Sequence, residues 1–298
     1  AILRTEGAAG LTSAMIFGEP GGFHGHFDKL GFVLFGFGQE LGVDPGNARP
    51  QAYRMPIHNA WYRATLSHNT VVVDGVSQAP STGRALAFGA NERMAVVVAE
   101  AGPVYPDLVH RRLLAQTPEY LVVMDDLVSS SEKDRRFAWF YHNRGTDVIS
   151  ETNVRPTRPE KGLEGADYFE DYRAGLSEGW SRVRFLSGAV TTHVLSSGGP
   201  GTRLATANGP GSNIQERIPL MAMFRRGRGA LFAAIVEPTQ TGQAPSVTAA
   251  ELTRTGNGLR LLVRRADGTD EIEWLPDSVT VRRAGQIVLR VNPRPERE

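Results

Sequence analysis

Residues 135–142 read RRFAWFYH, and this stretch decides the class of fold. In an extended strand successive side chains point to opposite faces, so the aromatic residues at positions 137, 139 and 141 share one face. Residues 259–265, LRLLVRR, alternate in the same way. Alternation with a period of two is typical of half-buried strands, and both stretches therefore predict β-structure.

Candidate strands follow one another at short spacing along the chain. Turn residues are abundant, with 33 glycines and 18 prolines, and Asn257-Gly258 and Asp267-Gly268 suit tight hairpins. No window of roughly 15 residues carries an amphipathic helical stripe. We therefore predict an all-β fold, a large antiparallel multi-sheet β-sandwich with little helix. The predicted strands are Phe32–Phe37, Thr70–Asp74, Arg93–Glu100, Tyr120–Asp125, Phe137–His142, Ser181–Phe185, Ala189–Leu195, Ala230–Glu237, Leu259–Arg264 and Gln286–Val291.

Two stretches interrupt or end this pattern. Residues 143–179 form a long polar segment, which predicts either a binding loop or a disordered insertion. The last residues look like a small terminal hairpin subdomain with a charged, proline-containing tail. We divide the chain into a β-sandwich domain of residues 1–240 and a small C-terminal β subdomain of residues 241–298.

The composition argues against several classes of protein. The formal net charge is only +1, so no nucleic-acid partner is expected. No apolar run approaches the roughly 20 residues of a membrane span, so no membrane insertion is expected. The chain has no cysteine, so disulfides cannot stabilise its fold. Two basic clusters, Arg111-Arg112 and Arg225-Arg226-Gly227-Arg228, face either solvent or an anionic ligand.

The chemistry concentrates in residues 21–78, which hold four of the seven histidines, among them His24, His26 and His68. If the segment is extended, His24, His26 and Asp28 project from one face. Neutral imidazoles and a carboxylate are the usual ligands of a cation such as zinc. His26, Asp44 and His68 suit that role, although isolated histidines more often pack or form hydrogen bonds.

Other residues in this region suit acid–base chemistry or substrate binding. His24, close to a cation but not bound to it, would stay neutral and could act as a general base. Tyr53 and Tyr62 could donate or accept a proton, or could simply pack. Arg54 and Arg63 could hold a carboxylate through a bidentate fork.

At this point a known family becomes visible. The blocks HGHFD (24–28), LGVDPG (41–46) and YRATLSHNTVVVDG (62–75) resemble the β-sheet domain of heparinase II/III-like polysaccharide lyases. That family includes heparin, heparan and alginate lyases, among them exo-acting oligoalginate lyases. The resemblance implies a large antiparallel β-sandwich that is normally joined to an N-terminal (α/α) toroid, which is absent from this chain.

The resemblance also implies roles for individual residues. His24 matches the catalytic or substrate-contacting histidine that opens the family motif. His26, Asp44 and His68 match zinc ligands of several members, and the metal would be chiefly structural. A catalytic tyrosine occurs in alginate-cleaving relatives, but the alignment before His68 is ambiguous.

The expected reaction is β-elimination on a uronate-containing polysaccharide or oligosaccharide of the alginate or heparin/heparan type. The toroid of the family supplies the other wall of the cleft and would be the missing partner domain. The chain begins Ala-Ile-Leu-Arg, without an initiator methionine or a signal-peptide pattern, so we expect the C-terminal portion of a longer enzyme, inactive alone. The resemblance to this family implies a periplasmic or secreted bacterial protein.

Two alternatives stay open from the sequence. The chain could be a non-catalytic carbohydrate-binding or structural β-sandwich whose histidines only hold a metal staple. It could also be a hydrolase, for which Asp28, Asp44 and Asp74 would have to supply a carboxylate pair. The products separate a lyase from a hydrolase, because only elimination leaves an unsaturated sugar.

Overall fold

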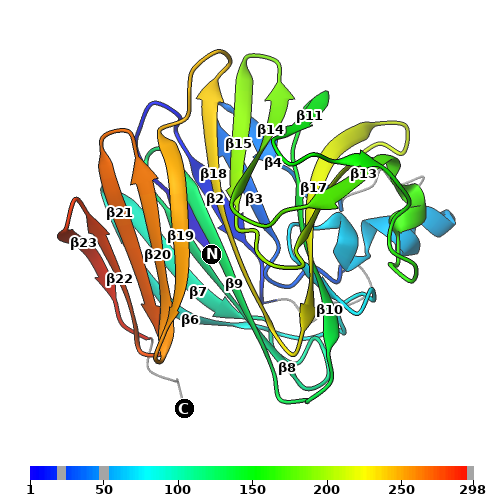
Figure 1. Ribbon diagram of the computed structural model, residues 1–298, viewed down its shortest axis with the longest axis horizontal. Helices are drawn as coiled ribbons and strands as arrows, with labels where there is room; N and C mark the ends of the chain where they lie inside the picture. The colour runs from blue at the N-terminus through cyan, green and yellow to red at the C-terminus, as the bar shows by residue number, and fades with distance from the viewer. Residues whose placement is uncertain (19–24, 47–53, 294–298) are drawn as a thin grey trace.

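The computed structural model describes residues 1–18, 25–46 and 54–293. Within these residues the strands form four sheets, and every pair of neighbouring strands is antiparallel (Figure 1). The short helices within the described ranges are η2 (His58–Tyr62), η3 (Thr65–Ser67) and η4 (Ala166–Tyr168). The predicted all-β, multi-sheet antiparallel class is therefore confirmed.

The two largest sheets form the centre of the molecule. The order of the eight-stranded sheet is β11 (Asp147–Ser150), β14 (Ser181–Ser187), β15 (Val190–Ser196), β18 (Ala230–Gln240), β9 (Leu121–Ser129), β8 (Leu108–Gln116), β7 (Met94–Glu100) and β6 (Arg84–Asn91). The order of the six-stranded sheet is β12 (Arg155–Pro156), β13 (Glu170–Leu176), β16 (Arg203–Pro210), β17 (Arg217–Gly227), β10 (Arg135–His142) and β5 (Val71–Val73).

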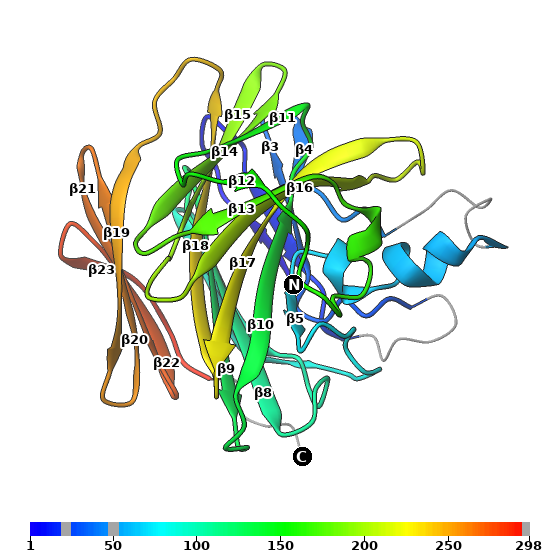
Figure 2. The ribbon, with the colours of Figure 1, turned by 45° about the vertical axis from the view of Figure 1, so that its right-hand side comes forward.

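Two smaller sheets come from the ends of the chain. The four-stranded sheet runs β1 (Ile2–Arg4), β2 (Thr12–Met15), β3 (Phe32–Gly36) and β4 (Gln39–Gly42). The five-stranded sheet runs β19 (Val247–Thr255), β20 (Gly258–Arg265), β21 (Gly268–Leu275), β22 (Ser278–Arg283) and β23 (Gln286–Val291). In Figures 1 and 2 the five-stranded sheet lies at the left and the segment around η2 at the right.

Strand β10 is buried on both faces, not on one as its alternation predicted. Phe137, Trp139 and Tyr141 enter the main hydrophobic core between the sheets. Ala138 and Phe140 enter a second, outer cluster. That outer cluster contains side chains of η2 and of the segment around η4, which cover the face that would otherwise meet solvent. The sequence pattern of one strand cannot reveal a cover that comes from elsewhere in the chain.

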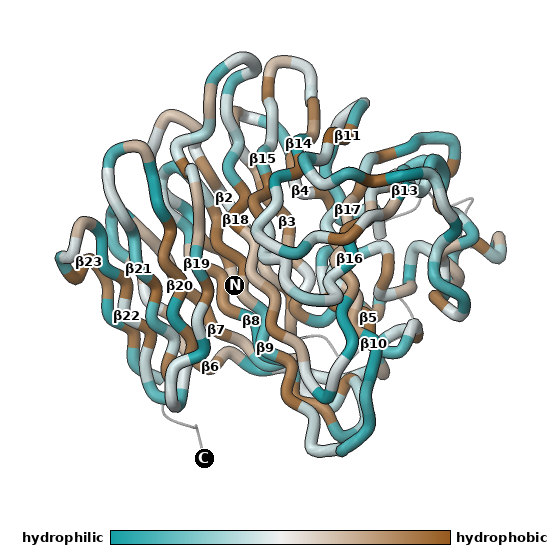
Figure 3. Tube along the Cα trace, viewed as in Figure 1, coloured by the Kyte–Doolittle hydropathy of each residue, from teal (hydrophilic) through white to brown (hydrophobic). Residues whose placement is uncertain are grey.

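Strand β20 behaves as its sequence predicted. Leu259, Leu261 and Val263 are buried, whereas Arg260 and Arg264 are exposed. Asn257-Gly258 and Asp267-Gly268 stand at the β19–β20 and β20–β21 connections, as expected. All ten predicted strands are present within a few residues of their predicted bounds. Apolar segments follow the central strands in Figure 3, with β18 as a clear example.

Residues 143–179 are more regular than predicted. They contribute β11, β12, η4 and β13, and so join both large sheets at their edges. The alternative of a disordered insertion is therefore wrong, whereas the binding-loop alternative stays a prediction. The side chains of Leu163, Ala166 and Tyr172 pack into the outer cluster, which explains how a polar segment is held in place.

The five-stranded sheet packs on the eight-stranded one. A hydrophobic cluster joins Val96, Leu113 and Val122 of the large sheet to Leu261 and Ile272 of the small one. The division into domains at residues 240 and 241 stays a prediction. Among the described residues no helix is long and apolar enough to cross a membrane.

Candidate functional site

The segments that carry the candidate residues meet at one end of strand β10. The amide of Val43, just beyond β4, donates a hydrogen bond to the carbonyl of His142 over 3.1 Å, and Gly42 bridges to Asn143. His68 follows η3 directly, before β5, which pairs with β10. The chain thereby brings His26, Asp44 and His68 from three separate segments to one place.

Gly46 marks the point where these side chains converge. A Cβ atom placed on Gly46 would lie 2.6 Å from Nδ1 of His26, 2.7 Å from Cε1 of His68 and 2.8 Å from Oδ1 of Asp44. Those distances are shorter than van der Waals contact, so only glycine fits. The backbone at this position therefore lines a small cradle of two imidazoles and a carboxylate.

A second carboxylate stands beside the same histidines. Ligand atoms of His26, Asp28 and His68 lie within 4.8 Å of one another, so this group could hold a metal ion. Asp28 is not among the metal ligands that the sequence predicted. Asp44 instead contacts His68, with 2.8 Å between Oδ1 and Nδ1, and the rings of His26 and His68 have centroids 5.3 Å apart. We call His26, Asp28, Asp44, His68 and His142 the histidine cluster.

Electrostatics differ among the members of this cluster. Burial alone would raise the pKa of Asp44, but the charge of His68 and hydrogen bonds from His68 and the Gly46 amide lower it to about 2. Burial would lower the pKa of His68, but the charge and hydrogen bond of Asp44 raise it. Burial, with the neighbouring His68, lowers the pKa of His26 to about 4, which keeps this imidazole neutral.

Two ring nitrogens in the cluster lack a partner. Nε2 of His68 and Nε2 of His142 are buried and make no hydrogen bond to the described residues. Nδ1 of His142 lies 3.2 Å from Oδ1 of Asn69, and burial lowers the pKa of His142 to about 3. Buried polar atoms without partners are uncommon and call for a bound ion or water. The donor set of imidazoles and carboxylates fits a cation such as zinc.

Asn69 and Arg112 hold the backbone around the cluster. The Asn69 side-chain amide donates to the carbonyls of Phe32 and Val43 over 2.7 and 3.0 Å. Arg112 is wholly buried, forms a two-pronged pair with Asp125 at 2.8 Å, and donates to the carbonyls of Asn69 and Leu30. The basic cluster Arg111-Arg112 therefore divides between surface and core, because Arg111 pairs with Glu100 outside.

Arg63 binds the chain next to His26 rather than standing free. Its Nε donates to the carbonyl of Gly25 over 3.0 Å, and its guanidinium lies 5.2 Å from the centroid of the Phe27 ring. The amide of Phe27 in turn donates to the carbonyl of Arg63. These contacts fix the segment that carries His26.

The remaining predicted residues have different surroundings. Tyr62 is fully buried in η2, its hydroxyl donates to the carbonyl of Gly211 over 2.9 Å, and burial raises its pKa. Arg54 is exposed. His24 and Tyr53 lie outside the described residues. Asp74 pairs with Arg135 at the start of β10, the opposite end of that strand from His142, so it does not join Asp28 and Asp44.

A family model and two curated proteins match the sequence. The model described as "Heparinase II/III-like, C-terminal" matches residues 8–296. An alginate lyase of Stenotrophomonas maltophilia (strain K279a) is 27% identical over 269 residues, which are 80% of this chain and 36% of that protein. An exo-oligoalginate lyase of Saccharophagus degradans is 24% identical over 253 residues, which are 72% of this chain and 33% of that protein.

Solved structures share the fold. A heparan sulfate lyase from Pedobacter heparinus matches with a TM-score of 0.64 at 17% identity, over 89% of this chain and 39% of its own length. A heparinase III structure matches with a TM-score of 0.66 at 12% identity, over 90% of this chain and 40% of its own. The chain thus spans about a third of the length of the curated relatives it matches.

Proposed function

The chain belongs to the heparinase II/III-like, C-terminal family, and on this premise we propose that it is the β-sheet part of a polysaccharide lyase. The substrate is a uronate-containing polysaccharide or oligosaccharide, and the reaction is β-elimination. The observation that carries the proposal is the convergence of His26, Asp44 and His68 on Gly46. The names of the two curated relatives favour alginate over heparan sulfate.

The reaction needs three things from the protein. The uronate carboxylate must be neutralised, because the C5 proton is otherwise too weakly acidic. A base takes that proton, the bond between C4 and the glycosidic oxygen breaks, and the leaving oxygen receives a proton. The product carries a C4–C5 double bond, and no water is consumed.

We assign the proton transfers to His24 and to Tyr53 or Tyr62, as the sequence predicted. Tyr62 is the weaker candidate of the two tyrosines, because its buried hydroxyl already donates to a backbone carbonyl. Arg54 is exposed and could contact the uronate carboxylate. Arg63 acts instead on the protein, since it holds the chain on both sides of His26.

Zinc suits the histidine cluster. His26 and His68 would supply nitrogen ligands, and Asp44 or Asp28 the carboxylate. When bound, the ion would link the segments that meet at Gly46 and add positive charge beside His26, two residues after His24 in the sequence. The unpartnered Nε2 of His68 supports this assignment. Because His68 is fully buried, the metal would be structural rather than a binding site for substrate.

The same burial keeps a second function in consideration, a carbohydrate-binding β-sandwich whose metal only fastens the fold. The toroid domain as partner, and a periplasmic or secreted location, follow from the family resemblance and stay predictions.

The test uses the natural protein that carries this chain, incubated with alginate and separately with heparan sulfate. Elimination raises the ultraviolet absorbance, because the new double bond is conjugated with the carboxylate. We expect His24→Ala to lower the rate by about 10²–10⁴-fold. His193→Gln is the matched control, because His193 lies on β15, outside the histidine cluster. Saturated products would establish a hydrolase, and binding without cleavage would establish the carbohydrate-binding alternative.

A further inference from the structure

A cavity of about 570 Å³ opens at the end of the six-stranded sheet where β10 begins and β17 ends, away from the histidine cluster. It lies over the first residues of β10 and the last residues of β17, beside the glycine-rich loop Gly198–Thr202. Its volume falls in the range of roughly 300–1,000 Å³ that is usual for small-molecule sites. Arg136 stands at this end of β10 and His142 at the other, about 20 Å away at 3.4 Å per residue.

The charged residues of the cavity are strongly unbalanced. Four arginines line it against one carboxylate, that of Glu160. The Glu160 carboxylate already forms an ion pair, since Nη1 of Arg203 lies 3.2 Å from its Oε1. The whole chain has a net charge of only +1, so this concentration of positive charge is local.

The other arginines have no carboxylate partner among the described residues. Arg136 donates to the backbone carbonyls of Asp74 and Lys161 over 2.8 and 3.0 Å. Arg225 donates to the carbonyl of Ser197 over 2.6 Å and to neighbouring oxygens, and burial lowers its pKa to about 10. Backbone carbonyls satisfy hydrogen bonds but leave the positive charge uncompensated.

The register of the six-stranded sheet places two of these positive charges opposite each other. Arg136 of β10 and Arg226 of β17 are direct cross-strand partners. Like charges in such positions destabilise a sheet, because their side chains leave the same face at close range. An anion held between the two guanidinium groups would relieve that repulsion.

The cavity also has an apolar part. Val72, Leu163 and Phe224 line it and belong to the outer hydrophobic cluster. An apolar wall next to unpaired guanidinium groups suits a ring that carries an anionic group, more than it suits a bare ion.

We propose that this cavity binds an anionic sugar of one or two residues, held by its carboxylate or sulfate between Arg136 and Arg226. The site is separate from the histidine cluster. The anion-binding cavity follows from the structure, whereas the choice of a sugar as its ligand rests on the proposed function.

Calorimetric titration of this chain with a uronate disaccharide tests it, with the neutral glucose disaccharide and inorganic sulfate as comparison ligands. We expect binding of the uronate disaccharide that weakens as salt is added, and weaker binding of the other two. Arg226→Gln should weaken binding about tenfold, because it removes one charged hydrogen-bond donor. Arg226 is exposed, so the variant should fold.

Arg290→Gln is the matched control, an exposed arginine of β23 outside the cavity, and it should bind like the wild type. Three results would overturn the proposal: no binding at millimolar disaccharide, equal binding by Arg226→Gln, or sulfate binding as tight as that of the sugar.

Discussion

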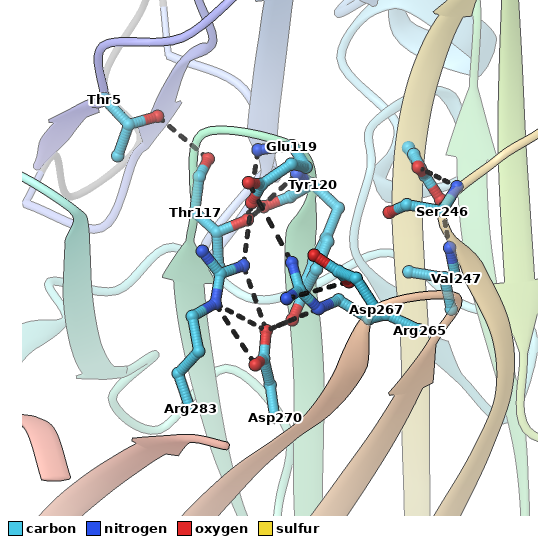
Figure 4. Close-up of polar contacts among 11 residues, drawn as sticks. Thr5, Thr117, Glu119, Tyr120, Ser246, Val247, Arg265, Asp267, Asp270 and Arg283 are labelled. Atoms are coloured by element: carbon cyan, nitrogen blue, oxygen red, sulfur yellow. Dashed lines mark hydrogen bonds and ion pairs between the residues drawn. The ribbon is translucent and has the colours of Figure 1, made fainter. Parts of the chain in front are cut away.

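Two buried polar regions of this molecule differ in how their charges are neutralised. At the junction of the eight-stranded and five-stranded sheets, Asp270 accepts a hydrogen bond from Tyr120 over 2.5 Å and pairs with Arg283 at 3.1 Å (Figure 4). Arg265 also contacts Asp270, and Glu119 pairs with Arg283 at 2.8 Å. We call these five residues the junction network.

In the histidine cluster Asp44 contacts His68 and Asp28 pairs with Lys29, but these contacts leave part of the imidazole donor set unused. His26, Asp44 and His68 converge on Gly46, yet two buried ring nitrogens of the cluster have no partner among the described residues. The junction network joins two sheets with charges that the chain itself supplies on both sides. The histidine cluster is complete only with something added from outside. The comparison suggests that the first region serves stability and the second serves binding.

The largest effect should come from Asp270→Ala. The change leaves Arg265, Arg283 and the hydroxyl of buried Tyr120 without their shared carboxylate, so we expect a loss of about 3–5 kcal/mol in the free energy of unfolding. Chemical denaturation measures this loss. Asp267→Ala is the control, because its carboxylate is 70% exposed and pairs with no described residue other than Arg265, and it should cost at most about 0.5 kcal/mol. Equal costs would remove the junction network from the comparison.

His68→Ala, in contrast to Asp270→Ala, should lower zinc affinity more than it lowers stability. The free energy of unfolding without metal should fall by about 1–3 kcal/mol, less than in Asp270→Ala, because the change removes one charged contact, that of Nδ1 with Oδ1 of Asp44 at 2.8 Å. Zinc affinity should fall by at least about 100-fold, more than the loss of a supporting residue costs. Titration with zinc against a competing chelator measures the affinity. If zinc affinity were unchanged and stability fell strongly, the histidine cluster would serve stability, as the junction network does.

The sequence predicted the histidine cluster better than the junction network. The family blocks pointed to His26, Asp44 and His68, and the structure brings all three to Gly46. Their convergence depends on backbone contacts between β4 and β10, which lie about a hundred residues apart in the chain. Spacing alone could not have indicated it, and Asp28 was assigned no ligand role for the same reason.

The partners of buried charges were the hardest feature to predict. Arg112 sits in a basic pair that could have been a solvated surface, but it is buried opposite Asp125 in the β8–β9 ladder. Arg136 and Arg226 face each other only because β10 pairs with β17. Strand formation is local and visible as alternation, whereas these pairings depend on which strands become neighbours.

Comparison of Asp44→Asn with Asp28→Asn tests which of the two carboxylates in the histidine cluster binds the metal. We expect Asp44→Asn to weaken zinc binding about tenfold, because it removes the charge that contacts His68 at 2.8 Å. Asp28→Asn should weaken it less, since the Asp28 carboxylate already pairs with Lys29 at 3.2 Å. The same chelator competition measures both. The reverse order would make Asp28 the ligand and Asp44 the group that orients His68.

His193 tests whether an unpartnered nitrogen is enough to mark a site. Its Nδ1 is buried without a hydrogen bond, as in the cluster, and its Nε2 lies 3.2 Å from Oγ1 of Thr239. Burial, with the charges of Arg182 and Arg184, lowers its pKa to about 4. The cross-strand carboxylate of Glu237 is occupied by the amides of residues 246 and 247.

The smallest effect should therefore come from His193→Gln, and it should appear only in acid. In the unfolded chain the imidazole has a pKa near 6.5, so between about pH 6.5 and 4 the unfolded state binds more protons and stability falls as the pH falls. With allowance for screening by solvent, this histidine accounts for about 1 kcal/mol of that loss. Denaturation at a series of pH values should show a shallower decline in His193→Gln, while its zinc affinity stays that of the wild type. A change in zinc affinity would mean that isolated histidines also bind the metal, and the distinction would no longer rest on the convergence of several ligands at Gly46.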